Sequence, residues 1–229
     1  MNVVRYPSPR AFLDAVEPFL LADEACHNLL LGIPARLIAQ HSPIDTLYLA
    51  AAVDRGEVAC AAMMTPPWNL VLSKTTRPNA IRGLAADIAA IRPAPPGVNG
   101  VAELAEQFAV AWRELTGERV EPVLRERIHR LDVVRPLSPV AGRLRLAAAE
   151  DRSLLVDWLE AFAGEAFPPG SRPPTDAAAI VEARLGTPGE GLVLWEDIKP
   201  RCVVGYGSVT RNGIRIGPVY TPPEHRNHG

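Results

Sequence analysis

The chain has 229 residues, of which 48% are hydrophobic and 22% charged, and its formal net charge is −2. This composition is typical of a folded globular protein and excludes an intrinsically disordered chain. The near balance of charges, with no run of like sign, gives no indication of a basic surface for nucleic acid.

The start of the chain and its cysteines bear on the compartment. The first ten residues contain two prolines and no apolar stretch after a basic start, so no secretory signal is expected. No apolar run approaches the roughly 20 residues that a membrane-spanning helix needs. Cys26, Cys60 and Cys202 are far apart and odd in number, which favours free thiols over a disulfide framework. We therefore expect a cytoplasmic protein with neither a membrane nor a nucleic-acid partner.

The first half of the chain alternates between helical and extended patterns. Apolar residues recur at three- and four-residue spacing over residues 9–39, which predicts two or more short helices with breaks at Pro18 and Pro34. Strands are then expected at 46–53, 58–64, 69–73 and 97–100, helices at 79–91 and 101–115, and a long strand at 120–134. Arg55-Gly56 is expected to turn the first hairpin, and Gly117 to end the second of these helices.

The same order of elements restarts after Pro136. A strand is expected at 143–147, helices at 150–167 and 176–185, and strands at 191–196, 201–210 and 215–220. Thr175 or Asp176 is the expected cap of the second helix, and Asn212-Gly213 is a strong hairpin signal. The sequence therefore predicts an α+β, three-layer architecture in two domains, 1–135 and 136–229. Each has a mixed, mostly antiparallel sheet flanked by helices.

The residues around the last expected strand form the most informative motif. Pro218 lies inside that strand and lacks an N–H group, so a bulge or a splayed pair is expected there. The strand runs into Thr221-Pro222-Pro223 and then into Arg226-Asn227-His228-Gly229. A glycine-containing turn that leads into a helix presents converging N–H groups with no side chain in the way, as a pyrophosphate requires.

This motif and the element order resemble the GNAT superfamily of N-acetyltransferases, whose Arg/Gln-x-x-Gly-x-Gly/Ala loop holds the pyrophosphate of acetyl-CoA. Residues 226–229 match the start of that loop, and the sequence contains its first glycine but neither the second nor the following helix. The resemblance covers residues 143–229 with motif support and residues 9–134 by element order alone. It implies a degenerate GNAT-like first domain and, in the second, the N-terminal part of an acetyl-CoA-binding GNAT domain, which is incomplete.

The resemblance also implies the residues of the site. Backbone groups of Val219, Tyr220 and Thr221 would line the gap that admits the pantetheine arm, and one N–H group would face the thioester oxygen. The pyrophosphate would contact a second set, which comprises Arg226, Asn227, His228 and Gly229. The turn at 73–78 in the first domain has no glycine, so no CoA is expected to bind there. The usual GNAT general acid lies on a later helix that this sequence does not contain, so no catalytic residue is assigned.

Other residues carry competing interpretations. His225 and His228 have ligand spacing, but only Glu224 accompanies them, so no metal site is predicted. A carboxylate of Glu196 or Asp197 could act as a general base for the acceptor amine, although a polar strand end is the commoner use of such residues. Cys202 has no His partner close in sequence and is not assigned as a nucleophile.

Two functions remain open. The first is an N-acyltransferase that transfers an acetyl group from acetyl-CoA to an amine of a small molecule or a peptide by direct attack. The second is a truncated or inactive GNAT-like remnant that binds CoA weakly or serves as an interaction module. In either case we expect this polypeptide to bind acetyl-CoA poorly and to self-associate through an uncovered sheet edge.

Overall fold

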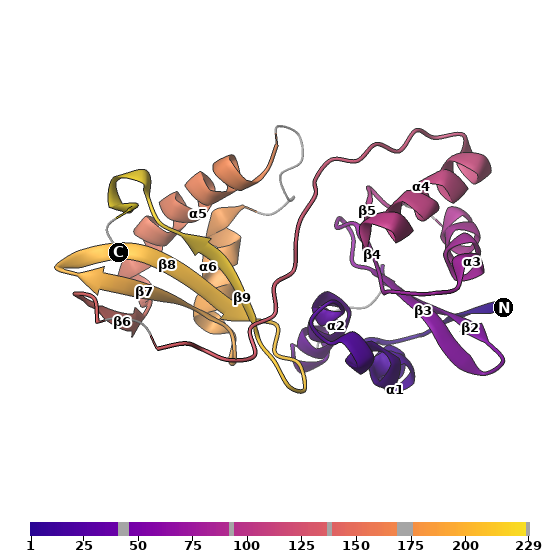
Figure 1. Ribbon diagram of the computed structural model, residues 1–229, viewed down its shortest axis with the longest axis horizontal. Coiled ribbons are helices and arrows are strands. Elements are labelled where there is room, and N and C mark those ends of the chain that lie inside the picture. The colour runs from indigo at the N-terminus through magenta and orange to yellow at the C-terminus, as the bar shows by residue number, and fades with distance from the viewer. Residues whose placement is uncertain (41–45, 92–93, 137–138, 169–175, 228–229) are drawn as a thin grey trace. The chain divides into compact units, whose positions relative to one another are not determined.

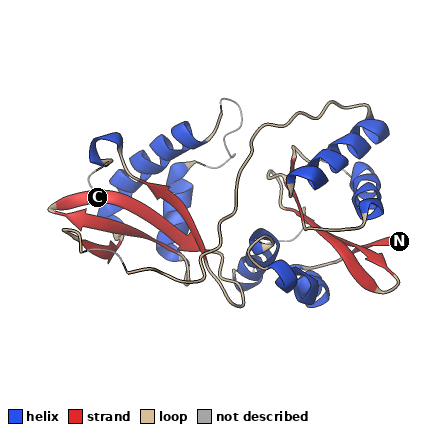
Figure 2. Ribbon diagram, in the orientation of Figure 1, coloured by secondary structure: helices blue, strands red, loops and turns tan. Residues whose placement is uncertain are grey.

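Two separate β-sheets organise the chain in the computed structural model, which describes residues 1–40, 46–91, 94–136, 139–168 and 176–227 (Figures 1 and 2). The sheets belong to two units, Met1–Ile128 and His129–Gly229. The predicted α+β class, with mostly antiparallel sheets flanked by helices, is confirmed. None of the helices in the described ranges is long and apolar enough to cross a lipid bilayer.

In the first unit, the described residues form a five-stranded sheet and four α-helices. Its elements are β1 (Asn2–Arg5), α1 (Pro9–Leu20), α2 (Asn28–Ala39), β2 (Tyr48–Asp54), β3 (Glu57–Met64), β4 (Leu70–Leu72), α3 (Pro78–Ala89), β5 (Val98–Asn99) and α4 (Ala102–Thr116). A short 3₁₀ helix at Leu21–Asp23 follows α1. The strands lie in the order β1-β2-β3-β4-β5, antiparallel except for the parallel pair of β4 and β5.

Helices cover both faces of this first sheet. Alternate residues of a strand point to opposite faces, so β2 contributes Leu49 and Ala51 to one side and Ala50 and Ala52 to the other. The first side packs against α1 and α2, and the second against α3 and α4. The expected three-layer arrangement is therefore present in the first unit.

The second unit repeats the order of the first six elements. Its elements are β6 (Arg143–Leu146), α5 (Arg152–Ala166), α6 (Ala177–Gly186), β7 (Gly191–Asp197), β8 (Lys199–Gly207) and β9 (Arg215–Tyr220). Short 3₁₀ helices lie at Ala149–Asp151 and Pro223–His225. The strand order is β6-β7-β8-β9 with every pair antiparallel, which matches β1-β2-β3-β4. Helices α5 and α6 pack against one face of this sheet, on Leu192, Leu194 and Val203.

Local signals fixed several helix ends and turns as expected. Asp176 caps α6 by accepting a hydrogen bond from the backbone N–H of Ala179, and Gly117 ends α4 with a left-handed φ of 78°. Arg55 and Gly56 turn the β2–β3 hairpin with positive φ values of 52° and 86°. Asn212-Gly213, by contrast, is not a two-residue turn, because β8 and β9 are joined by the longer loop 208–214.

Two expectations about helices and strands are wrong for physical reasons. Two short helices are present as expected, but Pro18 and Pro34 lie inside α1 and α2 without breaking them. The buried residues Val16 and Leu20 of α1, and Leu30, Leu31 and Pro34 of α2, hold the helices on the sheet and outweigh one lost hydrogen bond in each. The strand expected at 120–134 has no regular structure. An extended segment needs a partner backbone, and β5 at the end of the first sheet is only two residues long.

The first strand of the chain, β1, was not predicted from the sequence. β1 pairs with β2, with Val3 opposite Ala52. Four residues are too few to show an alternating pattern, and the two adjacent valines are the only signal in the sequence that could have indicated it.

Replacement of a buried side chain should separate core from surface. Leu84 of α3 is fully buried, so Leu84→Ala should lower the free energy of unfolding of the first unit by about 2–5 kcal/mol through lost burial and a cavity. Val110→Ala on α4, where the side chain is 47% exposed, should change it by less than about 0.5 kcal/mol. Urea unfolding followed by circular dichroism measures both. Equal losses in the two variants would contradict the assigned core.

Candidate functional site

The last strand of the second unit bulges beside Pro218. Val204 pairs with Val219 and Tyr206 with Ile216, so that Gly217 and Pro218 stand opposite the single residue Gly205. Pro218 has no N–H group and cannot donate a hydrogen bond to the neighbouring strand. The extra residue in β9 lets strand pairing resume on both sides of this missing donor. The bulge that the sequence predicted at Pro218 is therefore present.

Gly205 and Arg184 hold the bulge in place. A Cβ atom on Gly205 would lie 2.6 Å from the carbonyl oxygen of Gly217 and 2.9 Å from Cδ of Pro218, so only a glycine fits there. Arg184 of α6 donates from Nη1 to the carbonyl oxygen of Tyr206 and from Nη2 to that of Gly217, the latter at 3.2 Å. The guanidinium group thus ties both strands to the helix on the covered face.

Val219 and Tyr220, the first two residues after the bulge, differ in burial. Val219 is 54% exposed, whereas the Tyr220 ring is buried against Trp158 and Phe162 of α5. The Tyr220 hydroxyl donates to Oε1 of Glu165 at 3.2 Å. Burial raises the pKa of Tyr220 above its usual value, and the bond to Glu165 raises it further. Tyr220 is therefore a protonated donor that joins β9 to α5.

Arg226 closes the turn that follows β9. Its Nη2 donates to both carboxylate oxygens of Glu165, at 3.0 and 2.8 Å, and its Nε donates to the carbonyl oxygen of Thr221 at 2.8 Å. The guanidinium group also lies over the Tyr220 ring, 5.7 Å from its centre. The structure thus brings Tyr220, Thr221 and Arg226 together with Glu165, which the sequence analysis did not single out.

The remaining residues of the expected phosphate loop are only partly placed. Asn227 has a positive φ of 64°, a conformation that asparagine tolerates better than most residues. His228 and Gly229 lie outside the described residues. Of the four residues expected to contact pyrophosphate, Arg226 and Asn227 are therefore the two with a defined position.

The carboxylates at the end of β7 are paired with arginines. Glu196 accepts from Arg145 and from Arg143, the latter at 3.2 Å, and these bonds lower the pKa of Glu196 below its usual value. Arg145 also binds Asp151 in a two-pronged contact at 2.6 and 2.8 Å. A carboxylate with a lowered pKa is a weaker base, so this geometry favours the polar strand-end interpretation of Glu196.

The histidine and cysteine candidates have simple surroundings. Nδ1 of His225 accepts a hydrogen bond from Arg201 at 3.2 Å. Within the described residues, no three His, Cys, Asp or Glu side chains are grouped so that they could hold a metal ion. Cys26, Cys60 and Cys202 are free thiols, and burial raises the pKa of Cys60 to about 11.

The turn after β4 in the first unit corresponds to the phosphate loop in element order. The backbone N–H of Lys74 donates to Nε2 of His27 at 3.0 Å, and that of Arg77 donates to Oγ1 of Thr75 at 3.0 Å. Nδ1 of His27 lies 2.8 Å from the carbonyl oxygen of Leu20 and therefore carries the ring hydrogen. These two N–H groups are therefore already bonded within the protein.

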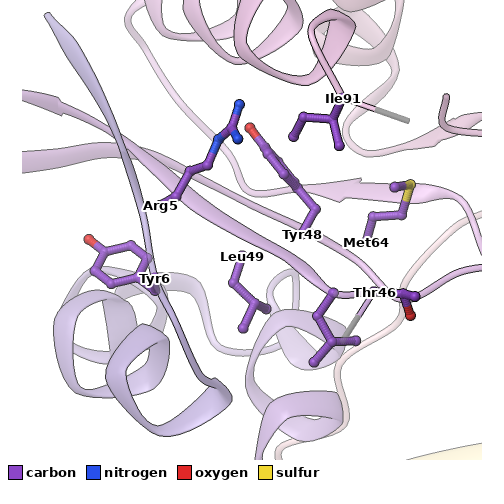
Figure 3. Close-up of a pocket in the computed structure, with 8 residues that line it drawn as sticks. Arg5, Tyr6, Thr46, Tyr48, Leu49, Met64 and Ile91 are labelled. Carbon is purple, nitrogen blue, oxygen red and sulfur yellow. The ribbon is translucent and has the colours of Figure 1, made fainter. Parts of the chain in front are cut away.

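A small pocket of about 180 Å³ lies where β1 meets β2 in the first unit (Figure 3). Its polar residues are Arg5, Tyr6, Thr46 and Tyr48, and the side chains of Arg5 and Tyr48 lie close to each other (Figure 3). Both bind Asp87, the guanidinium at 2.8 and 3.0 Å and the hydroxyl at 2.9 Å. Burial raises the pKa of Tyr48, so this hydroxyl stays protonated. The mutual pairing leaves little capacity for a ligand, and we treat this network as structural.

A methyl group at the bulge should be costly. Gly205→Ala would press a Cβ atom against the carbonyl of Gly217, and we expect a loss of about 1–3 kcal/mol in the unfolding free energy of the second unit. Gly213→Ala is the matched control, since its nearest neighbour would be Oγ1 of Thr210 at 3.5 Å. Thermal or urea unfolding compares the stability of the two variants. If Gly205→Ala unfolds like the unmodified protein, β8 and β9 are farther apart at the bulge than the structure shows.

His27 should make the first unit sensitive to mild acid. Burial lowers the pKa of His27 below 6.5, so the unfolded chain takes up a proton at a higher pH than the folded chain does. Stability is thus full above about pH 6.5 and falls as the pH drops toward the folded pKa. The melting temperature of the first unit should decrease between about pH 7 and pH 5. His27→Gln should reduce this dependence of the melting temperature on pH, and His225→Gln should not. If the dependence is unchanged in His27→Gln, other titrating groups cause it.

Comparisons with known proteins add no identity to this geometry. A scan against models of known protein families gives no match, and a search of curated proteins finds no similar sequence.

Proposed function

We propose that the chain is an N-acyltransferase of the GNAT type, which transfers an acetyl group from acetyl-CoA to an amine of a small molecule or a peptide. The bulge of β9 at Gly217 and Pro218 is the main observation in favour of this proposal. A bulged strand leaves backbone groups without ladder partners and re-aims the residues that follow it. The repeated element order β-α-α-β-β-β agrees with the GNAT order that the sequence resembles.

The proposal gives the described residues of the site distinct tasks. Backbone groups of Val219, Tyr220 and Thr221 would exchange hydrogen bonds with the amides of the pantetheine arm, as an added strand would. One N–H group among them would face the thioester oxygen and stabilise the negative charge that develops on it. Arg226 and Asn227 would meet the pyrophosphate, for which a guanidinium group is a strong, charge-assisted donor.

The reaction itself needs no covalent enzyme intermediate. The amine nitrogen attacks the thioester carbonyl carbon, the C–S bond breaks, CoA leaves as the thiolate, and the amine loses a proton. Positioning and oxyanion stabilisation supply most of what this transfer requires. We assign neither the base nor the acid, and Glu196 is a poor candidate for the base because two arginines bind it. A cytoplasmic location belongs to the proposal, because free thiols persist in a reducing compartment.

The Glu165–Arg226 pair favours a second function. A guanidinium group bound to a carboxylate at 2.8 Å has its charge largely compensated, so a phosphate must compete with Glu165 for it. A GNAT-like module that binds CoA weakly, or that acts through protein contacts without turnover, is the alternative that this pair supports.

Titration with acetyl-CoA tests the assignment of Arg226. We expect weak binding by the unmodified chain. Arg226→Ala should weaken it by at least about tenfold, since a charge-assisted hydrogen bond contributes about 1.5–3 kcal/mol. Glu165→Gln should tighten binding by removing the competitor. Arg215→Ala, at the opposite end of β9, is the matched control and should leave the affinity unchanged.

The outcomes of the titration separate the two functions. Binding that does not change in Arg226→Ala would mean that the pyrophosphate site lies elsewhere. Binding that responds as expected, without release of CoA thiol in the presence of a mixture of amines, would favour the non-catalytic alternative.

A further inference from the structure

One face of the sheet in the second unit is mostly apolar, and no helix formed by the described residues of this unit packs on it. The strand register places nine uncharged, mostly apolar side chains on this side, which we call the open face: Leu144, Leu146, Val193, Trp195, Cys202, Val204, Tyr206, Ile216 and Val219. The same side also carries Gly191 and, next to the β7–β8 turn, Asp197 and Lys199. The bulge at Gly217 and Pro218 is what brings Ile216 and Val219, three positions apart, onto the same face.

The side chains of the open face are poorly buried. Leu144, Leu146 and Ile216 are 61%, 66% and 57% exposed, whereas Leu192, Leu194 and Val203 on the opposite face are almost fully buried. Both helices of the unit lie on that opposite side of the sheet (Figure 2). None of the nine residues is charged, and Asp197 and Lys199 on the same side have opposite signs, so the open face offers little to an anionic ligand or to nucleic acid.

The first unit shows how the same strand order is completed elsewhere in this chain. There α1 and α2, which connect the first strand to the second, cover one face, as α5 and α6 do in the second unit. The other face of the first sheet, with Ala50, Ala62 and Leu72, is buried under α3 and α4. The open face is the counterpart of that buried face, and the largest continuous apolar patch on a protein surface is often an interaction site.

We propose that the open face is the contact surface of a homodimer in which two copies pack open face against open face. Flat antiparallel sheets pack in this way at a separation of about 10 Å, with the side chains of both inner faces interdigitating. A twofold contact brings identical patches together and covers both open faces at once. This differs from association through the edge of β9, which would pair backbones and leave the open-face side chains in water.

The area of the open face indicates how strong this dimer is. A fully exposed aliphatic side chain presents roughly 100 Å² of apolar surface, so the nine residues together expose on the order of 400–500 Å² per copy. The dimer would bury about 900 Å² in total, which is at the low end of specific interfaces and fits a weak, concentration-dependent contact. The proposal is independent of any acetyl-CoA chemistry.

Sedimentation velocity over about a hundredfold range of protein concentration tests the proposal. We expect a monomer–dimer equilibrium for the unmodified chain. The double variant Leu144→Lys/Leu146→Lys should weaken it by at least tenfold, because it would place four charges in the apolar contact. The control is Val110→Lys/Leu115→Lys, which changes two apolar side chains of α4 that are 47% and 45% exposed. It should dimerise like the unmodified chain.

A second variant tests whether any loss of dimer results from misfolding and not from a changed contact surface. Leu144→Thr/Leu146→Thr keeps side chains that suit a strand and adds no charge, and circular dichroism should match the unmodified protein. In sedimentation velocity, the fraction of dimer formed by this variant should also be lower than that of the unmodified chain. A chain that stays monomeric at every concentration would overturn the proposal and leave the open face to another polypeptide. Dimers that survive both β6 variants would place the contact elsewhere, with the β9 edge as the first candidate.

Discussion

Each sheet of this chain has two apolar faces, and the need to cover both is the constraint on which the rest of the structure depends. In the first unit two pairs of helices meet it, and the small side chains of Ala50, Ala51, Ala61 and Ala62 let them approach the strands closely. In the second unit one pair of helices covers one face only. The two units share a strand order, so this difference lies in the covering layers and not in the strands.

Much of the fold was predictable because short-range signals agreed with the tertiary structure. The Arg55-Gly56 turn, the Asp176 cap and Gly117 each specify a backbone geometry through one or two residues. The segment 120–134 shows the limit of such reasoning. Its apolar residues are compatible with a strand, but a strand exists only when another backbone accepts its hydrogen bonds. Leu131 and Val133 instead remain 76% and 74% exposed.

The candidate site was predictable in part for the same reason. The bulge at Pro218 follows from one residue that cannot join a ladder, so the sequence contains the whole argument. Glu165 could not be found in this way. It is one of several acids on the helix expected at 150–167, and only the packing of α5 on β9 brings it to Tyr220 and Arg226, 55 and 61 positions away. A partner so distant in sequence leaves no signal in local spacing.

The Glu165–Arg226 pair couples the fold to the proposed chemistry. The same guanidinium group that would recognise a phosphate fastens the turn after β9 to α5, through Glu165 and the carbonyl of Thr221. Releasing Arg226 to an anion would therefore also release this turn, so part of the binding free energy would be spent on the structural contact. Because Arg226 and Glu165 are both partly exposed, this competition should weaken phosphate binding by up to about fivefold, since such an ion pair contributes up to about 1 kcal/mol.

The bulge of β9 brings the proposed dimer contact and the proposed pantetheine site together at Val219. Val219 lies on the open face because of the bulge, and its backbone lies where the pantetheine arm is proposed to bind. A second copy packed on the open face would approach β9 from the side-chain direction, whereas an added pantetheine would approach from the strand edge. The two contacts meet at Val219 without requiring each other, and any effect of one on the affinity for the other is reciprocal by linkage.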